Sequence, residues 1–163
     1  MTSKEWKTLD PLQQAAIVQA QQNFPVKVGM LAKTFGLSVL ASTLPAGISG
    51  EIRPQGVSYQ IKINRHDSPA RQRFTLAHEL AHFLLHRDVI GDGISDDVLY
   101  RSSLSDTREA QANRLAADIL MPADVVRREL QLRKGMPRSQ QVEELANLFS
   151  VSSAAMEIRL GFL

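Results

Sequence analysis

Cysteine is absent from the 163 residues of this chain. That absence removes disulfide frameworks, thiolate metal sites and cysteine nucleophiles together. No apolar run approaches the roughly 20 residues needed to cross a bilayer, so we expect no membrane-spanning segment. The first residues have no apolar stretch after their positive charges, which argues against a secretory signal and for a cytoplasmic location. Any metal must then be held by histidine and carboxylate side chains.

An excess of charge of one sign is also missing. The chain has 19 Lys and Arg against 17 Asp and Glu, a formal net charge of only +2. This balance is too small to predict a nucleic-acid partner. The one basic cluster, between Arg127 and Arg138, is interrupted by Glu129 and by apolar residues at helical spacing. We interpret it as the solvated face of a helix.

Apolar and polar residues alternate with a period of two in three short segments near 37–43, 47–52 and 57–64, between Gly and Pro breaks. This pattern predicts a small antiparallel sheet. In the last segment Val57, Tyr59, Ile61 and Ile63 share one face, which should lie on the core.

Elsewhere the apolar spacing and the end signals are helical. Proline at the first helical position and a preceding Asp or Ser mark two of the starts, at Pro11 and Pro69. The segment 88–106, rich in Asp and Gly, is interpreted as a long loop. The predicted helices cover residues 12–23, 28–35, 69–87, 107–121, 123–133, 139–149 and 153–160.

The predicted fold is therefore α+β, a small sheet packed on a helical bundle. We interpret residues 1–163 as one domain, because the length suits a single core. Residues 1–25 form an N-terminal helix, and 26–133 hold the sheet and the helices of the site. Residues 139–163 form two helices, similar to a helix-turn-helix, that close the domain.

The segment His78-Glu79-Leu80-Ala81-His82 is an HExxH pattern on the helix predicted from Pro69. Residues four apart lie on one helical face about 6 Å apart, so both imidazoles can reach one ion. Glu79 lies one step round the helix, where its carboxylate stays off the ion but near the open coordination position. That is the place for a general base.

Spacing alone leaves several candidates for the third ligand. His86 lies two turns, about 12 Å, from His78, too far to share an ion with it, so a packing or cleft-wall role is expected. Asp88 is a weaker candidate, because the helix has no glycine turn before it. Glu109, in the next helix, is the better one, although a carboxylate in a first helical turn is also favoured by the helix dipole. Asn113, one turn further on, could orient a ligand through a hydrogen bond.

Three blocks carry a resemblance to the ImmA/IrrE family of metallopeptidases. They are residues 68–86, 109–122 and 145–152, and the hairpin around Ile48-Ser49-Gly50 and Ile61-Lys62-Ile63-Asn64 adds a weaker match. The first two blocks are specific and the third is generic. Ala81 and Leu115 stand where Gly and Phe are common in the family.

The resemblance implies a zincin-like domain in which His78, His82 and Glu109 bind zinc and Glu79 is the catalytic base. His and carboxylate ligands also serve manganese. Members of the family cleave transcriptional repressors of the helix-turn-helix kind, in stress responses and in the control of mobile elements. The resemblance therefore implies a zinc endopeptidase with such a repressor as its protein substrate.

Two questions stay open in the sequence. The tetrahedral intermediate of peptide hydrolysis needs a donor besides the metal, and Tyr100 is the first candidate, ahead of His66, Arg71 and His86. The alternative function is a regulator that binds DNA or a partner without cutting it, for instance in a toxin–antitoxin pair. The helix-turn-helix pattern at 145–160 favours that alternative, and Glu79, which no binding role needs, counts against it.

Overall fold

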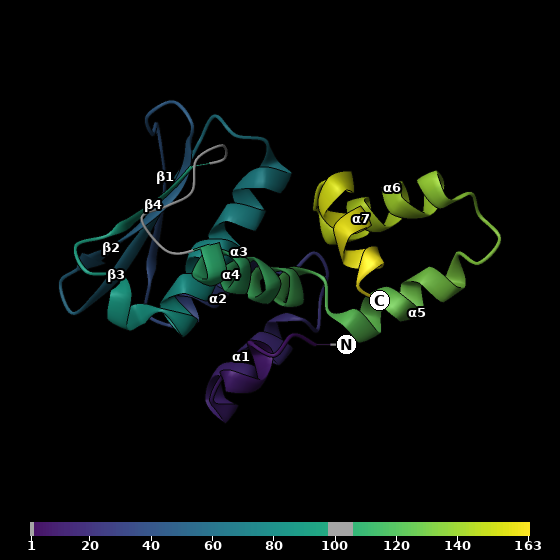
Figure 1. The fold of residues 1–163 in the computed structure, drawn as a ribbon, viewed down its shortest axis with the longest axis horizontal. Helices are drawn as coiled ribbons and strands as arrows, with labels where there is room; N and C mark the ends of the chain where they lie inside the picture. Colours follow the sequence, from purple (N-terminus) through teal and green to yellow (C-terminus); the bar gives the residue numbers. More distant parts are fainter. Residues whose placement is uncertain (1, 98–105) are drawn as a thin grey trace.

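This computed structural model describes residues 2–97 and 106–163. The described part is α+β, as predicted (Figure 1). Its α-helices are α1 (Pro11–Ala20), α2 (Val28–Thr34), α3 (Pro69–Leu85), α4 (Asp106–Leu120), α5 (Ala123–Leu132), α6 (Arg138–Phe149) and α7 (Ser153–Gly161). Its strands are β1 (Ser38–Ser42), β2 (Ile48–Gln55), β3 (Ser58–Asn64) and β4 (Ile94–Asp97), and two short 3-10 helices are η1 (Trp6–Thr8) and η2 (Arg87–Val89). None of these helices is long and apolar enough to cross a membrane.

Local capping explains where the helices begin. The side chain of Asp10 accepts a hydrogen bond from the backbone of Gln13, whose side chain bonds back to Asp10, before Pro11 opens α1. At α3 the hydroxyl of Ser68 accepts from the backbone N–H of Arg71, and Pro69 is the first helical residue. Such caps satisfy backbone donors that have no partner inside the helix. They are short-range signals, which is why the predicted starts are accurate.

The sheet is mixed, whereas the sequence analysis predicted a wholly antiparallel one. The strand order is β1-β3-β2-β4; β2 pairs antiparallel with β3 and β4, and β1 pairs parallel with β3. The chain does reverse direction from β1 to β2 and again from β2 to β3, but β1 lies beside β3 rather than beside β2, so the pair β1 and β3 is parallel. The alternation of apolar residues shows which side chains of a strand face the core, but it does not show which other strand lies beside it.

The core face of β3 is largely as predicted. Ile61 and Ile63 are buried, and the ring of Tyr59 packs edge-on against Phe83 of α3 with centroids 5.5 Å apart. The prediction that Val57 faces the core is wrong, because Val57 lies in the turn before β3 and is fully exposed. Part of the predicted loop is also structured, since β4 lies within it, η2 overlaps its start, and Ile94 is buried.

Helix α3 lies at the centre of the fold. It packs against β2 and β3 on one side and against α4 on another, and α2 also contacts it. In Figure 1 the sheet lies at one end of the molecule and α5 to α7 at the other, with α3 and α4 between them. This arrangement buries nine consecutive residues of α3, from Thr75 to Phe83.

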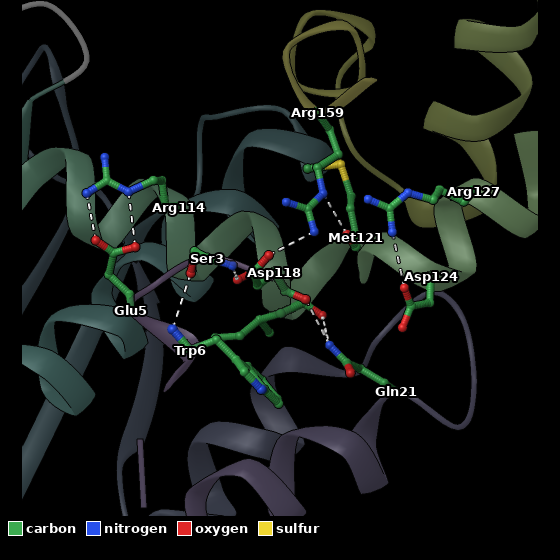
Figure 2. Close-up of polar contacts among 11 residues, drawn as sticks. Ser3, Glu5, Trp6, Gln21, Arg114, Asp118, Met121, Asp124, Arg127 and Arg159 are labelled. Carbon is green, nitrogen blue, oxygen red and sulfur yellow. Dashed lines mark hydrogen bonds and ion pairs between the residues drawn. The ribbon is translucent and has the colours of Figure 1, made fainter. Parts of the chain in front are cut away.

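A partly buried polar network joins residues near both ends of the chain to α4 (Figure 2). Asp118 of α4 accepts hydrogen bonds from Nη2 of Arg159 in α7 and from the backbone N–H of Ser3, both at 2.8 Å. Arg159 also donates to the carbonyl of Met121. The amide of Gln21 donates to the carbonyls of Asp118 and Ile119. Helices α1 and α7 are therefore both anchored on the C-terminal half of α4.

Arg73 makes the matching connection from α3. Its guanidinium donates to the carbonyls of Val26, Phe149 and Ser150. Ser150 is the residue after α6 and has a left-handed backbone, with φ 52°. The turn between α6 and α7 is thus held directly against the helix that carries the HExxH segment.

Candidate metal centre

Helix α3 places His78 and His82 one turn apart on the same face, as the four-residue spacing requires. The two imidazole rings have centroids 4.6 Å apart. His82 and Glu79 are completely buried and His78 is nearly so. The site is therefore built into a packed part of the helix, where polar side chains need specific partners.

Glu109, in the first turn of α4, reaches both histidines. Its Oε2 lies 3.2 Å from Nε2 of His78, and its Oε1 lies 3.4 Å from Nε2 of His82. The two Nε2 atoms are 3.0 Å from each other. The structure thus brings together the three residues that the sequence analysis chose as ligands, in a group that could hold a metal ion.

The donor set and its dimensions fit a small divalent cation. Ligand atoms about 2.0–2.1 Å from a tetrahedral ion lie about 3.3–3.4 Å from one another. The contacts in the cluster, where the two histidines face different oxygens of Glu109, range from 3.0 to 3.4 Å. Two imidazole nitrogens and a carboxylate that converge in this way bring electron-rich atoms together, which is favourable when a cation lies between them. Two histidines and one carboxylate also leave a fourth position for a small ligand.

Asn113, one turn after Glu109 in α4, contacts His78. Its side-chain oxygen lies 2.9 Å from Nδ1 of His78. An amide oxygen can only accept a hydrogen bond, so Nδ1 of His78 carries the proton and donates it. The lone pair of His78 is then on Nε2, the atom that faces Glu109.

His86 and Gln111 were not predicted to act together. Nδ1 of His86 lies 3.0 Å from Nδ1 of His82, and Nε2 of His86 lies 2.9 Å from the side-chain oxygen of Gln111. Burial lowers the pKa of His86, which favours its neutral form. The spacing of His86, four residues after His82, was the available signal, whereas nothing in the sequence singled out Gln111.

The side chain of Glu79 lies against strand β2. A Cβ atom built on Gly50 would be 3.0 Å from Oε1 of Glu79 and still closer to the methyl group of Thr75. The absence of a side chain at Gly50 is therefore what lets the carboxylate of Glu79 fit between α3 and the sheet.

The other residues considered in the sequence analysis, as oxyanion donors or as a third ligand, lie outside the cluster or outside the described residues. Arg71 donates to the hydroxyl of Ser49 and pairs with Asp67, while His66 is exposed and bonded to Thr43. Asp88 is exposed in η2, outside the cluster of His78, His82 and Glu109. Tyr100, the first candidate for the oxyanion donor, lies outside the described residues.

Comparison with known proteins agrees with this geometry. The family model of the IrrE N-terminal-like domain, of peptidase family M78, matches residues 31–161. The chain belongs to this family. The resemblance inferred from the sequence blocks is thereby confirmed, and the family's metallopeptidase character agrees with the His, His and Glu cluster.

Two curated relatives of this M78 chain are named radiation response metalloprotease IrrE. One is from Deinococcus deserti and the other from Deinococcus radiodurans, and each is 40% identical over 97 residues, 58% of this chain. The matched part covers 33% of the first relative and 28% of the second. The chain therefore spans about a third or less of the length of these relatives.

A solved structure, titled as a transcriptional regulator of Mycobacterium tuberculosis, has a similar fold. The TM-score is 0.57 and the identity 19%, over 93% of this chain and 47% of that one. At this identity the likeness concerns the arrangement of helices and strands alone.

Proposed function

We propose that this chain is a zinc-dependent endopeptidase. The observation that carries the proposal is the convergence of His78, His82 and Glu109, with Glu79 one residue along the same helix. A metal at such a site supplies Lewis-acid chemistry, acidifying water and polarising a carbonyl group. Zinc is the metal proposed first because two imidazoles and one carboxylate are among its usual ligand sets in hydrolytic enzymes. Manganese accepts the same donor types and is the alternative.

The chain's own residues supply the rest of the mechanism. Glu79 accepts the proton that water loses when its oxygen attacks the scissile carbonyl, and donates that proton to the departing amine as the C–N bond breaks. Asn113 holds His78 with its protonated nitrogen turned away from Glu109. The completely buried surroundings of His82 and Glu79 limit water around the reacting groups, which strengthens electrostatic interactions there.

The proposed substrate is a transcriptional repressor with a helix-turn-helix domain. This step rests on the family resemblance, and it gives the enzyme a place in a stress response or in the control of a mobile element. A repressor substrate would also place the reaction in the cytoplasm.

The alternative of a DNA-binding regulator is less well supported by the contacts. In α7, Arg159 is buried against Asp118 and so is withheld from any phosphate. Arg133 is paired with Glu129 and Glu144, which neutralise part of the basic cluster. Phosphate contacts need cations that are free to approach the backbone of the nucleic acid.

The test combines metal analysis with cleavage. Wild-type protein, Glu79→Gln and Glu109→Ala are purified and analysed for bound metal, then incubated with a helix-turn-helix repressor encoded beside the chain's gene and with a mixed peptide library. We expect about one zinc in wild-type and Glu79→Gln, and none in Glu109→Ala. Glu79→Gln should cleave at least about 100-fold more slowly than wild-type, as expected for loss of a general base.

Two outcomes separate the parts of the proposal. Cleavage of library peptides but not of the repressor would leave the peptidase standing and reject the substrate. A zinc-loaded wild-type protein that cuts neither would contradict the endopeptidase proposal itself.

A further inference from the structure

A largely buried series of three hydrogen-bonded side chains runs away from the cluster of His78, His82 and Glu109 on the side of His82. It consists of His82, His86 and Gln111, and it joins the last turn of α3 to α4. His82 is completely buried and His86 is 7% exposed. A hydrogen-bonded chain in such surroundings has few alternative partners, so its proton positions can be deduced from the chemistry of its end.

Gln111 sets the direction of these hydrogen bonds. Its side-chain oxygen has no hydrogen, so Nε2 of His86, 2.9 Å away, must be the donor. A neutral imidazole carries one proton, and Nδ1 of His86 is then an acceptor. Nδ1 of His82, 3.0 Å away, must therefore donate to it. That assignment leaves the lone pair of His82 on Nε2, which is the atom 3.4 Å from Glu109 and 3.0 Å from Nε2 of His78.

We propose that His86 and Gln111 act as positioning residues that hold His82 in the Nδ1–H tautomer and so prepare its Nε2 for the metal. Asn113 does the same for His78 through one hydrogen bond. Both imidazoles are then held with Nε2 toward Glu109, and α4 supplies the acceptor at the end of each chain. This inference rests on the metal site of the proposed function.

The proposal requires that the acceptor at position 86 matters more than the ring itself. Groups that orient metal-bound histidines in this way contribute about 10- to 100-fold to metal affinity. His86→Phe keeps a ring of similar size and removes both nitrogens. His86→Gln offers an oxygen to Nδ1 of His82 and an amide N–H to the oxygen of Gln111, so it can form both hydrogen bonds that His86 makes.

The first experiment measures zinc affinity by competition with a chelator. We expect affinity to fall about 10- to 100-fold in His86→Phe, to fall in Gln111→Leu, and to return close to wild-type in His86→Gln. His66→Phe is the matched control, because His66 is exposed, contacts Thr43 and takes no part in the His82, His86 and Gln111 series. The zinc affinity of this variant should equal that of wild-type. Gln111→Leu keeps the test decisive if His86→Phe fails to fold.

The second experiment reads the tautomer directly in the metal-free protein, without reference to cleavage. Histidine-labelled ¹⁵N spectra should show His82 as a single Nδ1–H tautomer in wild-type and His86→Gln, and as a mixture in His86→Phe. Unchanged zinc affinity and an unchanged tautomer in His86→Phe would overturn the proposal. Equal losses of affinity in His86→Phe and His86→Gln would overturn it as well, by assigning His86 a packing role. Since neither readout involves peptide cleavage, failure here is distinct from failure of the peptidase proposal.

Discussion

Gly50 of β2 lies directly against Glu79 of α3, so that a Cβ atom at position 50 would come within 3.0 Å of Oε1 of Glu79. The same atom would collide with the methyl group of Thr75. Both neighbours belong to a buried helix that cannot shift without disturbing the core. Position 50 must therefore be glycine for the carboxylate of Glu79 to keep its place.

Gly50→Ala should consequently lower the cleavage rate by displacing Glu79, while the metal ligands stay in place. We expect bound zinc to remain at about one per chain and the free energy of unfolding to fall by about 1–3 kcal/mol, the usual cost of overpacking. Cleavage assays, metal analysis and urea unfolding measure the three quantities. The control is Gly29→Ala in α2, where a Cβ would meet nothing within 4 Å. That variant should be as active as wild-type, and equal rates for both variants would contradict the packing argument.

If zinc binds as proposed, it should stabilise the folded chain, because the three side chains come together only in the folded state. At a free zinc concentration about 100 times the dissociation constant, the gain is about 2.7 kcal/mol, visible as a higher Tm. The gain should vanish in His78→Ala and Glu109→Ala. Asp88→Ala is the matched control, since Asp88 is an exposed acid of η2. Loss of the zinc effect in Asp88→Ala would show that Asp88 binds the metal, and the proposed set of His78, His82 and Glu109 would then be wrong.

The ion pair between Asp118 and Arg159 should be important for stability because both side chains are buried, 2% and 7% exposed. Arg159→Met leaves the carboxylate of Asp118 without its cation, and removing one partner of a buried pair costs about 3–5 kcal/mol. The double variant Asp118→Asn with Arg159→Met removes that stranded charge and should recover at least half of the loss in urea unfolding.

The exposed pair of Arg127 and Asp124, also drawn in Figure 2, provides the comparison. Arg127→Ala should change the free energy of unfolding by less than about 1 kcal/mol, as is usual for a solvated pair. A loss in Arg159→Met no larger than that in Arg127→Ala would contradict the role given to burial.

The sequence was sufficient for features that depend on neighbouring residues. The helix from Pro69 was predictable from Ser68, from the proline and from the apolar spacing. HExxH indicated three residues of the candidate site, because its spacing matches a helical turn. Asn113 followed from Glu109 by the same one-turn spacing. Glu109 itself needed the family resemblance, because no local rule says that α4 folds back on α3.

The features that were missed depend on the tertiary arrangement. Strand β4 has four residues, two of them Asp, and it becomes a strand because β2 offers it an unpaired edge. The parallel pairing of β1 with β3 depends on strand order, which periodicity does not encode. The contact of Gln111 with His86 joins residues 25 positions apart and exists because of how α3 and α4 pack.

The ion pair between Glu5 and Arg114 should make stability depend on pH. Two hydrogen bonds from the guanidinium of Arg114, at 2.6 and 3.1 Å, hold the pKa of Glu5 below its usual value. A carboxyl whose pKa is lower in the folded state stabilises the fold above its unfolded pKa of about 4.3, and this contribution is lost as the pH falls through the folded pKa. Glu5→Gln should therefore be less stable than wild-type at pH 7, and the two should converge toward pH 3.

The expected gap at pH 7 is about 0.5–1 kcal/mol, because the side chain of Arg114 is 44% exposed and solvent screens the pair. Urea unfolding at pH 7, 5, 4 and 3 measures it. Asp124→Asn is the control, since its side chain is 97% exposed and its pair with Arg127 should contribute little at any pH. A gap between wild-type and Glu5→Gln that stays constant down to pH 3 would show that Glu5 acts through packing rather than through its charge. Convergence would instead show that the N-terminal segment is held on α4, one residue from Asn113, by an interaction that acid removes.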